Sequence, residues 1–308
     1  MNQRQRPRAS VETALMAAVV LVAALVLSVI PNQAWAAVDC TSFLASNPTD
    51  PGTDFDNDGF TNFQECTRIT LADASDVLSC VASPTNPNPP AVRTACLDPN
   101  TKDLFIIYAP FVQVPPDTRT SLLPVPFNPF GPVTAYGVTF NGLTALGVTV
   151  HQITPAQAGA DRAVTTGQKA VRVAESLDAN GTVLGYCQWG TPNGLDGCTI
   201  YTQRIKNFIT STCGTNAIFR ANGDPEPGGV DAVFLAYTIH TFLHETGHTT
   251  GGNTGIYNSS YGGYHYKAGA NTLMEQYVTY SAKGGKCKFN ISTGWNTTLD
   301  PSTIRLTD

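Results

Sequence analysis

The stretch that most constrains the fold runs from Val230 to Thr250. Its side chains are apolar on nearly all sides, and a helix of that kind belongs in a protein interior. A Pro-Gly-Gly sequence precedes it, Gly251-Gly252 follows it, and Asp231 lies in the first turn, where the helix dipole favours an anion. We therefore predict one long helix buried inside the domain.

Beyond its start, the helix carries four ionisable residues, which are His240, His244, Glu245 and His248. Buried polar side chains need partners, and a metal ion is an efficient one. His244 and His248 are one helical turn apart, so both imidazoles project from the same face and can bind one ion. Glu245 lies one step round the helix, where it can deprotonate a water on a Zn²⁺ ion. We interpret His240 as a core or supporting histidine.

The sequence from His244 to Gly251 reads H-E-T-G-H-T-T-G. It resembles the start of the active-site motif of the zincin metallopeptidases, and of their metzincin branch most closely. That resemblance implies a zincin-like α+β catalytic domain that hydrolyses peptide bonds, with Glu245 as catalytic residue. The branch expects His or Asp at position 254, where this chain has Thr254, so the third zinc ligand must come from elsewhere.

Two downstream residues are candidates for that third ligand. His265 follows two glycines and precedes Met274, and a methionine after the last ligand resembles the turn beneath the zinc in metzincins. Glu275 is the alternative, because a downstream Glu completes the site in the thermolysin-like branch. We expect His265, with Glu275 still open.

The segments around the helix predict a small sheet. Short apolar or alternating runs at 104–108, 146–153 and 169–175 are typical of strands. The Gly-rich stretch 179–199 is interpreted as a loop. The expected fold class is α+β, with a small twisted sheet packed on the buried active-site helix.

Residues 54–65 match the D-x-D-x-D-G-x5-E spacing of calcium-binding loops. A solvated acidic turn is the alternative interpretation. In a calcium loop the ligands would be four carboxylates and one main-chain carbonyl, from Asp54, Asp56, Asp58, Glu65 and Phe60.

The surroundings of this loop differ from those of a helix–loop–helix calcium site. Pro48 and Pro51 disfavour an entering helix, and Cys66 follows the loop directly. The segment resembles a thrombospondin type 3 repeat, which implies a loop-rich, disulfide-tied module with a structural Ca²⁺ ion.

The chain begins with a basic stretch, an apolar run over 14–30 and an Ala-x-Ala sequence ending at Ala36. This layout predicts a secretory signal peptide over 1–36, and thus a secreted or periplasmic protein with no membrane attachment after cleavage. We divide the remainder into a disulfide-rich calcium-binding segment, 37–100, and a zinc metallopeptidase domain, 101–308.

Charge and cysteine content agree with export. The segment 1–36 carries three arginines and one glutamate, so its removal would change the formal net charge from −5 to −7. An acidic chain without a Lys/Arg run is not expected to bind nucleic acid. The eight cysteines predict disulfides, with the two halves of the chain stapled separately. They are Cys40, Cys66, Cys80, Cys96, Cys187, Cys198, Cys213 and Cys287.

Together these patterns predict a secreted zinc endopeptidase that acts on a polypeptide substrate and is stabilised by Ca²⁺. Two other functions stay open. One is a calcium-dependent binding or adhesion protein with an inactive zincin fold, and the other is zinc hydrolysis of a non-peptide substrate. The intact Glu245 favours an active enzyme, because a degenerate site would be expected to lose its general base.

Overall fold

The structure is a computed structural model in which Asp39–Asp308 form one compact unit. It describes residues 37–46, 52–108, 111, 131–136, 138–190, 194–214, 217–220, 229–250, 272–274, 278–283 and 286–295. Helices and sheets are mixed, which confirms the α+β class. Within those ranges, no helix has the length and apolarity needed to cross a membrane.

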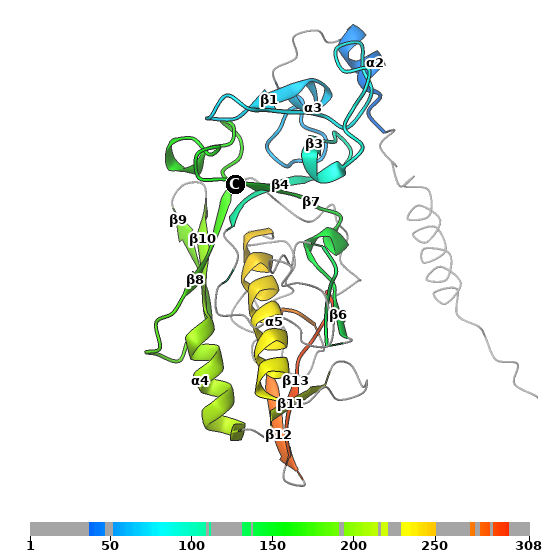
Figure 1. Cartoon of the computed structure of the whole chain (residues 1–308). Helices are drawn as coiled ribbons and strands as arrows, with labels where there is room; N and C mark the ends of the chain where they lie inside the picture. Colours follow the sequence, from blue (N-terminus) through cyan, green and yellow to red (C-terminus); the bar gives the residue numbers. More distant parts are fainter. Residues whose placement is uncertain are drawn as a thin grey trace, which may run out of the picture. The chain divides into compact units, whose positions relative to one another are not determined.

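The main sheet has five strands in the order β7-β4-β8-β10-β9 (Figure 1). Their bounds are β4 Asp103–Tyr108, β7 Thr149–Ile153, β8 Val171–Ser176, β9 Gly185–Gly190 and β10 Gly194–Tyr201. The first four strands in this order are parallel, and β9 is antiparallel to β10 at the edge. The three strands predicted from sequence are thus confirmed as neighbours at one end of this sheet.

The prediction of a loop over 179–199 is wrong, because β9 and most of β10 lie there. The glycines of this stretch suggested irregular backbone, but Gly185 is the first residue of β9 and is a glycine for a different reason. A Cβ atom at this position would collide with the side chain of Glu245 on the neighbouring helix. Glycine in a strand can mark such a close approach between elements rather than a turn.

Strand β4 is buried along its whole length, and its two faces belong to different hydrophobic cores. Leu104, Ile106 and Tyr108 join the core that surrounds the long helix. Phe105 and Ile107 point the other way, since side chains alternate across a strand, and they join a second core. The N-terminal segment, residues 37–100, contributes Phe60, Ile69, Leu71 and Leu97 to that second core. Packing therefore crosses the boundary at residue 100.

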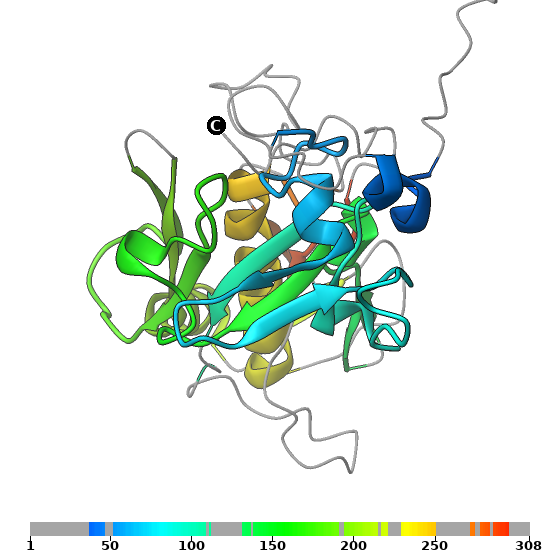
Figure 2. The same cartoon turned by 90° about the horizontal axis from the view of Figure 1, so that it is seen from above.

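The long helix, α5, spans Val230–Thr250, which confirms the bounds predicted from sequence. Figures 1 and 2 show it running beside the main sheet. Its residue Phe242 makes an edge-to-face contact with Tyr108 of β4, with ring centroids 5.6 Å apart. Helix α4, Thr202–Cys213, packs along α5. A long apolar helix is thus enclosed, as the sequence required.

Short elements complete the unit. The N-terminal segment contains a small sheet in the order β1-β2-β3, and a second three-stranded sheet has the order β11-β13-β12. The N-terminal elements are α2 Cys40–Ser46, α3 Asn62–Cys66, β1 Arg68–Thr70, β2 Asp76–Ser79, the 3-10 turn η1 Arg93–Ala95 and β3 Cys96–Leu97. The others are β5 Val133–Ala135, β6 Val138–Phe140, η2 Leu143–Leu146, η3 Ala160–Arg162, β11 Ala217–Arg220, β12 Thr279–Lys283 and β13 Lys286–Asn290.

All eight cysteines form disulfides, two in each half of the chain, so the prediction of separate staples is confirmed. The pairs are Cys40–Cys66, Cys80–Cys96, Cys187–Cys198 and Cys213–Cys287. Four disulfides in a chain of this size indicate an oxidising environment.

The Cys213–Cys287 bridge encloses the longest loop, with a sequence separation of 74 residues. Replacing both cysteines with serine should lower the free energy of unfolding by about 4 kcal/mol, because a long loop gains more freedom in the unfolded chain. The same change at Cys187 and Cys198, which are 11 residues apart, should cost about 3 kcal/mol. Urea denaturation of both double variants measures the difference, and the reverse order would contradict this explanation.

Candidate metal centres

His244 and His248 face each other on the buried surface of α5. Their Nε2 atoms are 3.2 Å apart, and the two rings meet edge to face. Both side chains are buried, with relative exposures of 9% and 8%. One helical turn separates them, as the spacing predicted. Two ring nitrogens at this separation can converge on a single ion.

The hydrogen bond at Nδ1 of His244 determines which atom of the ring can bind a metal ion. Nδ1 lies 2.9 Å from the main-chain carbonyl oxygen of Leu273, which can only accept a hydrogen bond. Nδ1 therefore carries a proton, and in the neutral form of His244 the lone pair is at Nε2. Metal-binding histidines are commonly oriented by such a bond from their other nitrogen.

The side chain of Glu245 lies between α5 and the edge strand β9. A Cβ atom built on Gly185 would be 2.6 Å from the Glu245 side chain, so β9 approaches it closely. Burial raises the pKa of Glu245 to about 8, and a hydrogen bond from the main-chain N–H of Cys187 opposes that rise. Both sulfurs of the Cys187–Cys198 disulfide lie within 3.5 Å of the Glu245 carbonyl oxygen. Strand β9 therefore contacts the Glu245 carboxyl group, and the disulfide contacts its main chain.

Met274 lies against α5 at the motif itself. A Cβ atom on Gly247 would come within 2.6 Å of the Met274 sulfur, so only glycine leaves room for this contact. Met274 is 1% exposed. The candidate third ligands, His265 and Glu275, lie outside the described residues, as does Thr254.

His240, the third histidine of α5, forms its hydrogen bond with Ser292 rather than with His244 or His248. Its Nδ1 donates to the carbonyl oxygen of Ser292 at 3.1 Å, and burial lowers its pKa to about 4. Its ring stacks on that of His244 with centroids 6.0 Å apart. These contacts agree with the interpretation of His240 as a neutral core histidine beside the pair.

The Gly185 contact yields a direct test of how Glu245 is positioned. If Glu245 transfers a proton in a zinc-dependent reaction, Gly185→Ala should lower turnover about tenfold or more while zinc content is unchanged, because the added Cβ atom would displace the carboxylate. Gly52→Ala is the matched control, since nothing lies within 4 Å of a Cβ atom there. Equal activity of both variants would show that β9 does not position Glu245.

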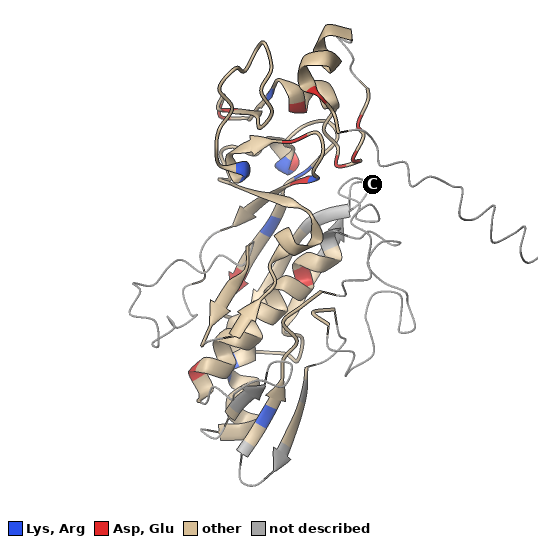
Figure 3. Ribbon diagram, turned by 90° about the vertical axis from the view of Figure 1, so that its right-hand side faces the viewer, with Lys and Arg blue, Asp and Glu red and all other residues tan. Residues whose placement is uncertain are grey.

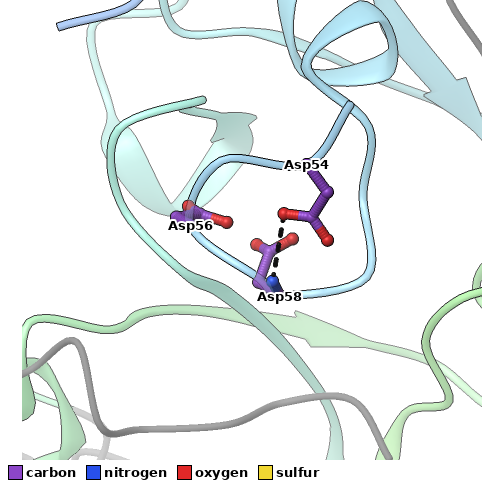
Figure 4. A group of neighbouring side chains, drawn as sticks. All are labelled: Asp54, Asp56 and Asp58. Atoms are coloured by element: carbon purple, nitrogen blue, oxygen red, sulfur yellow. Dashed lines mark hydrogen bonds between the residues drawn. The ribbon is translucent and has the colours of Figure 1, made fainter. Parts of the chain in front are cut away.

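The acidic loop forms a second centre. Asp54, Asp56 and Asp58 bring carboxylate oxygens within 4.8 Å of one another, and Figure 4 shows them converging inside the loop. Asp54 accepts hydrogen bonds from the main-chain N–H groups of Asn57, Asp58 and Gly59. These bonds fold the loop around its carboxylates.

Helix α3 places Glu65 at the far side of the same loop. Thr61 and Gln64 cap this short helix reciprocally, and Asn62 accepts a hydrogen bond from the main-chain N–H of Phe55. Glu65 is fully buried, and neither of its oxygens has a hydrogen-bond partner. Phe60 is buried in the second core, which accounts for an apolar residue at the seventh position of the loop.

Three carboxyl groups of the loop, those of Asp56, Asp58 and Glu65, are destabilised as anions when no cation is bound. Burial raises the pKa of Asp56 to about 7, with a further contribution from the charge of Asp54. Burial also raises the pKa values of Asp58 and Glu65 well above their usual range, and neighbouring carboxylates add to this effect. A bound cation would relieve both effects.

No family model, curated protein or solved structure matches this chain.

One acidic residue at this centre was missed by sequence analysis. Asp58, Glu65 and Asp103 form a second group with ligand atoms within 4.8 Å of one another. Asp103 is the first residue of β4, and it is fully buried. The sequence did carry a signal for Asp103, because an acidic residue at the start of a buried apolar strand needs a partner for its carboxylate. Figure 3 shows acidic residues gathered in this part of the molecule.

Proposed function

We propose that this chain is an exported, zinc-dependent metallopeptidase with an active site on α5. The observation that carries the proposal is the convergence of the His244 and His248 Nε2 atoms, 3.2 Å apart on a buried helix. The hydrogen bond from His244 to Leu273 supports it, because it leaves the Nε2 lone pair for an ion. The imidazole donors suit Zn²⁺, which also needs a third protein ligand.

Glu245 would act as the general base beside that ion, because it directly follows His244 on α5 and its side chain is buried. A bound zinc ion would supply Lewis acidity and lower the pKa of a water molecule to about 7. Glu245 would take the proton from the attacking water and return it to the leaving amine. The N–H of Cys187 and the backbone of β9 would hold the carboxylate in place for both transfers.

A polypeptide substrate is supported by the edge strand beside Glu245. In the described part of the main sheet, β9 has one neighbour, β10, and lies at the end of the strand order. An extended peptide can pair with such an edge through main-chain hydrogen bonds. A peptide bound in this way would pass close to Glu245, because Gly185 of β9 contacts it.

The acidic loop is proposed to bind Ca²⁺ as a structural ion. Glu65 is the strongest support, because a fully buried carboxylate without a hydrogen-bond partner requires a cation or a proton. Export through a signal peptide over 1–36 is proposed on the sequence and agrees with the four disulfides. A secreted enzyme meets the calcium concentrations that weak sites need.

The test of the enzyme is metal analysis combined with substrate assays. Purified protein should contain one zinc ion per chain and hydrolyse casein and internally quenched peptides, while small esters serve as the non-peptide substrates. Cleavage of esters alone would favour a non-peptide substrate. Zinc binding without any hydrolysis would favour a binding protein with an inactive site.

The third ligand can be identified by comparing two variants. His265→Ala should lower zinc content strongly, whereas Glu275→Gln should retain it, because the contact of Met274 with Gly247 agrees with a metzincin-type turn beneath the ion. Inductively coupled plasma mass spectrometry on both variants measures the difference. Loss of zinc in Glu275→Gln alone would assign the thermolysin-like ligand set instead.

A further inference from the structure

We propose that Asp103 is a ligand of the calcium centre, so that the bound ion joins the N-terminal segment to the main sheet. This inference rests on the proposed calcium site and extends it beyond the loop 54–65. The sequence motif supplies no ligand from outside the loop. The structure brings one from β4, 45 residues along the chain from Asp58.

The distances fit a shared ion. Two oxygens bound to one Ca²⁺ ion can be no farther apart than twice the metal–oxygen distance, which is about 4.6–5.2 Å. Carboxylate oxygens of Asp58, Glu65 and Asp103 lie within 4.8 Å of one another. Asp58 also belongs to the group with Asp54 and Asp56, so the two groups are continuous.

Burial of these carboxyl groups favours a bound cation at this position. Asp58, Glu65 and Asp103 are each 0% exposed. Both oxygens of Glu65 lack a hydrogen-bond partner although they lie beside two other carboxylates. Five carboxylates gather here near one lysine, Lys102, and one histidine, His151. Carboxyl groups at this density are stable in a protein interior only when they bind cations or protons, and a Ca²⁺ ion can neutralise several of them at once.

The environment of Asp103 fixes its carboxylate in place. Its Oδ2 accepts a hydrogen bond from the main-chain N–H of Asp98 at 3.0 Å, and its Oδ1 lies 2.7 Å from Nε2 of His151. The other nitrogen of His151 contacts the carbonyl oxygen of Thr94 at 3.1 Å. Each carboxylate oxygen has two lone pairs, so both can also face an ion. The side chain is oriented before any ion binds.

Main-chain contacts link the loop and β4 at the same point. The N–H of Asp103 donates to Oδ2 of Asp58 at 2.6 Å. Gln168 bridges the two segments, because its side-chain amide donates to the carbonyl oxygens of both Asp58 and Asp103. An ion shared by Asp58 and Asp103 would strengthen this connection, and β4 leads from there to the contact between Tyr108 and Phe242 of α5.

The test is calcium titration of the full-length protein by isothermal calorimetry, with calcium first removed on chelating resin and zinc restored. Asp103→Asn should raise the Kd for calcium at least tenfold. Asp98→Asn is the matched control, because it removes a buried negative charge five residues before Asp103 from a residue outside both groups. It should stay within threefold of the wild type.

A second control separates the ligand from its supporting pair. His151→Gln removes the imidazole that orients Asp103 but keeps the carboxylate, so it should raise the Kd for calcium less than Asp103→Asn does. Hydrogen exchange adds a structural measurement: calcium should slow exchange of the β4 amides in the wild type and not in Asp103→Asn. Anomalous scattering from wild-type crystals grown with terbium locates the ion without any variant.

Wild-type affinity in Asp103→Asn, or an ion more than 4 Å from the Asp103 carboxylate, would overturn the inference and leave the loop site intact. No calcium binding by the wild type would overturn the loop site and this inference together. Neither result bears on the zinc peptidase, whose failure would be seen in the metal and substrate assays.

Discussion

Glu245→Gln is expected to lower kcat by at least two orders of magnitude while one zinc ion stays bound. Loss of a general base costs about 10²–10⁴-fold in rate. Glutamine matches glutamate in shape, and its amide oxygen can still accept the hydrogen bond from Cys187. The contact with β9 at Gly185 is therefore retained, and the change removes proton transfer alone. Steady-state hydrolysis of a quenched peptide, with zinc measured on the same sample, gives both quantities.

Glu175→Gln is the matched control for this result. Glu175 lies on β8 of the same domain. Its side chain accepts a hydrogen bond from Thr202, which lies on α4 and not on α5. It should keep wild-type turnover. His248→Ala, in contrast, should lose both zinc and activity. Full activity in Glu245→Gln would remove the peptidase proposal.

Removal of calcium is expected to lower the Tm by about 5–10 °C. Calcium at 100 times its Kd stabilises the folded form by about 2.7 kcal/mol, and a domain of this size shifts by about 2–4 °C per kcal/mol. After EDTA treatment, zinc alone should restore activity but not thermal stability. The variant Asp56→Ala/Asp58→Ala should not respond to calcium, whereas Asp73→Ala, an exposed aspartate of the same segment, should respond as the wild type does.

The size of this calcium effect should depend on pH. Without calcium, burial raises the pKa of Asp56 from 3.8 to about 7, and the pKa values of Asp58 and Glu65 are raised as well. The calcium-free fold therefore holds these protons more tightly than the unfolded chain, and that stability is lost as pH rises from about 4 through about 7. Differential scanning calorimetry should show a larger calcium-induced rise in Tm at pH 8 than at pH 5. An equal rise at both values would contradict the site.

The long helix could be predicted from sequence with both its ends. Its apolar surface, its terminal glycines and its acidic first turn all agree, and such consistency fixes a helix before tertiary contacts are known. The strands at 104–108 and 146–153 were also recognisable, because parallel strands that are largely buried on both faces are apolar in sequence. The strand at 169–175 was recognisable from its alternating pattern. The spacing of His244 and His248 then determined the geometry of the pair.

Long-range packing was not predictable in the same way. The close approach of β9 to α5 depends on glycine at position 185, which local propensity interprets as a loop. The role of Asp103 depends on the loop at Asp58 reaching a strand 45 residues later. Strands β11 and β13 pair in parallel although α5 lies between them in the sequence, and no short motif encodes this pairing. Each of these features arises from contacts between distant segments rather than from local pattern.

The division of β4 between two cores limits how this protein could have been assembled or can be shortened. A chain that starts at residue 101 would expose Phe105, Ile107 and Ile153 to water, along one face of its central sheet. Exposed apolar strands of this kind promote aggregation. The N-terminal segment therefore acts as an intramolecular cover, and it cannot be exchanged between proteins as an independent cassette. Any relative that lacks it would have to carry polar residues on that face of the sheet.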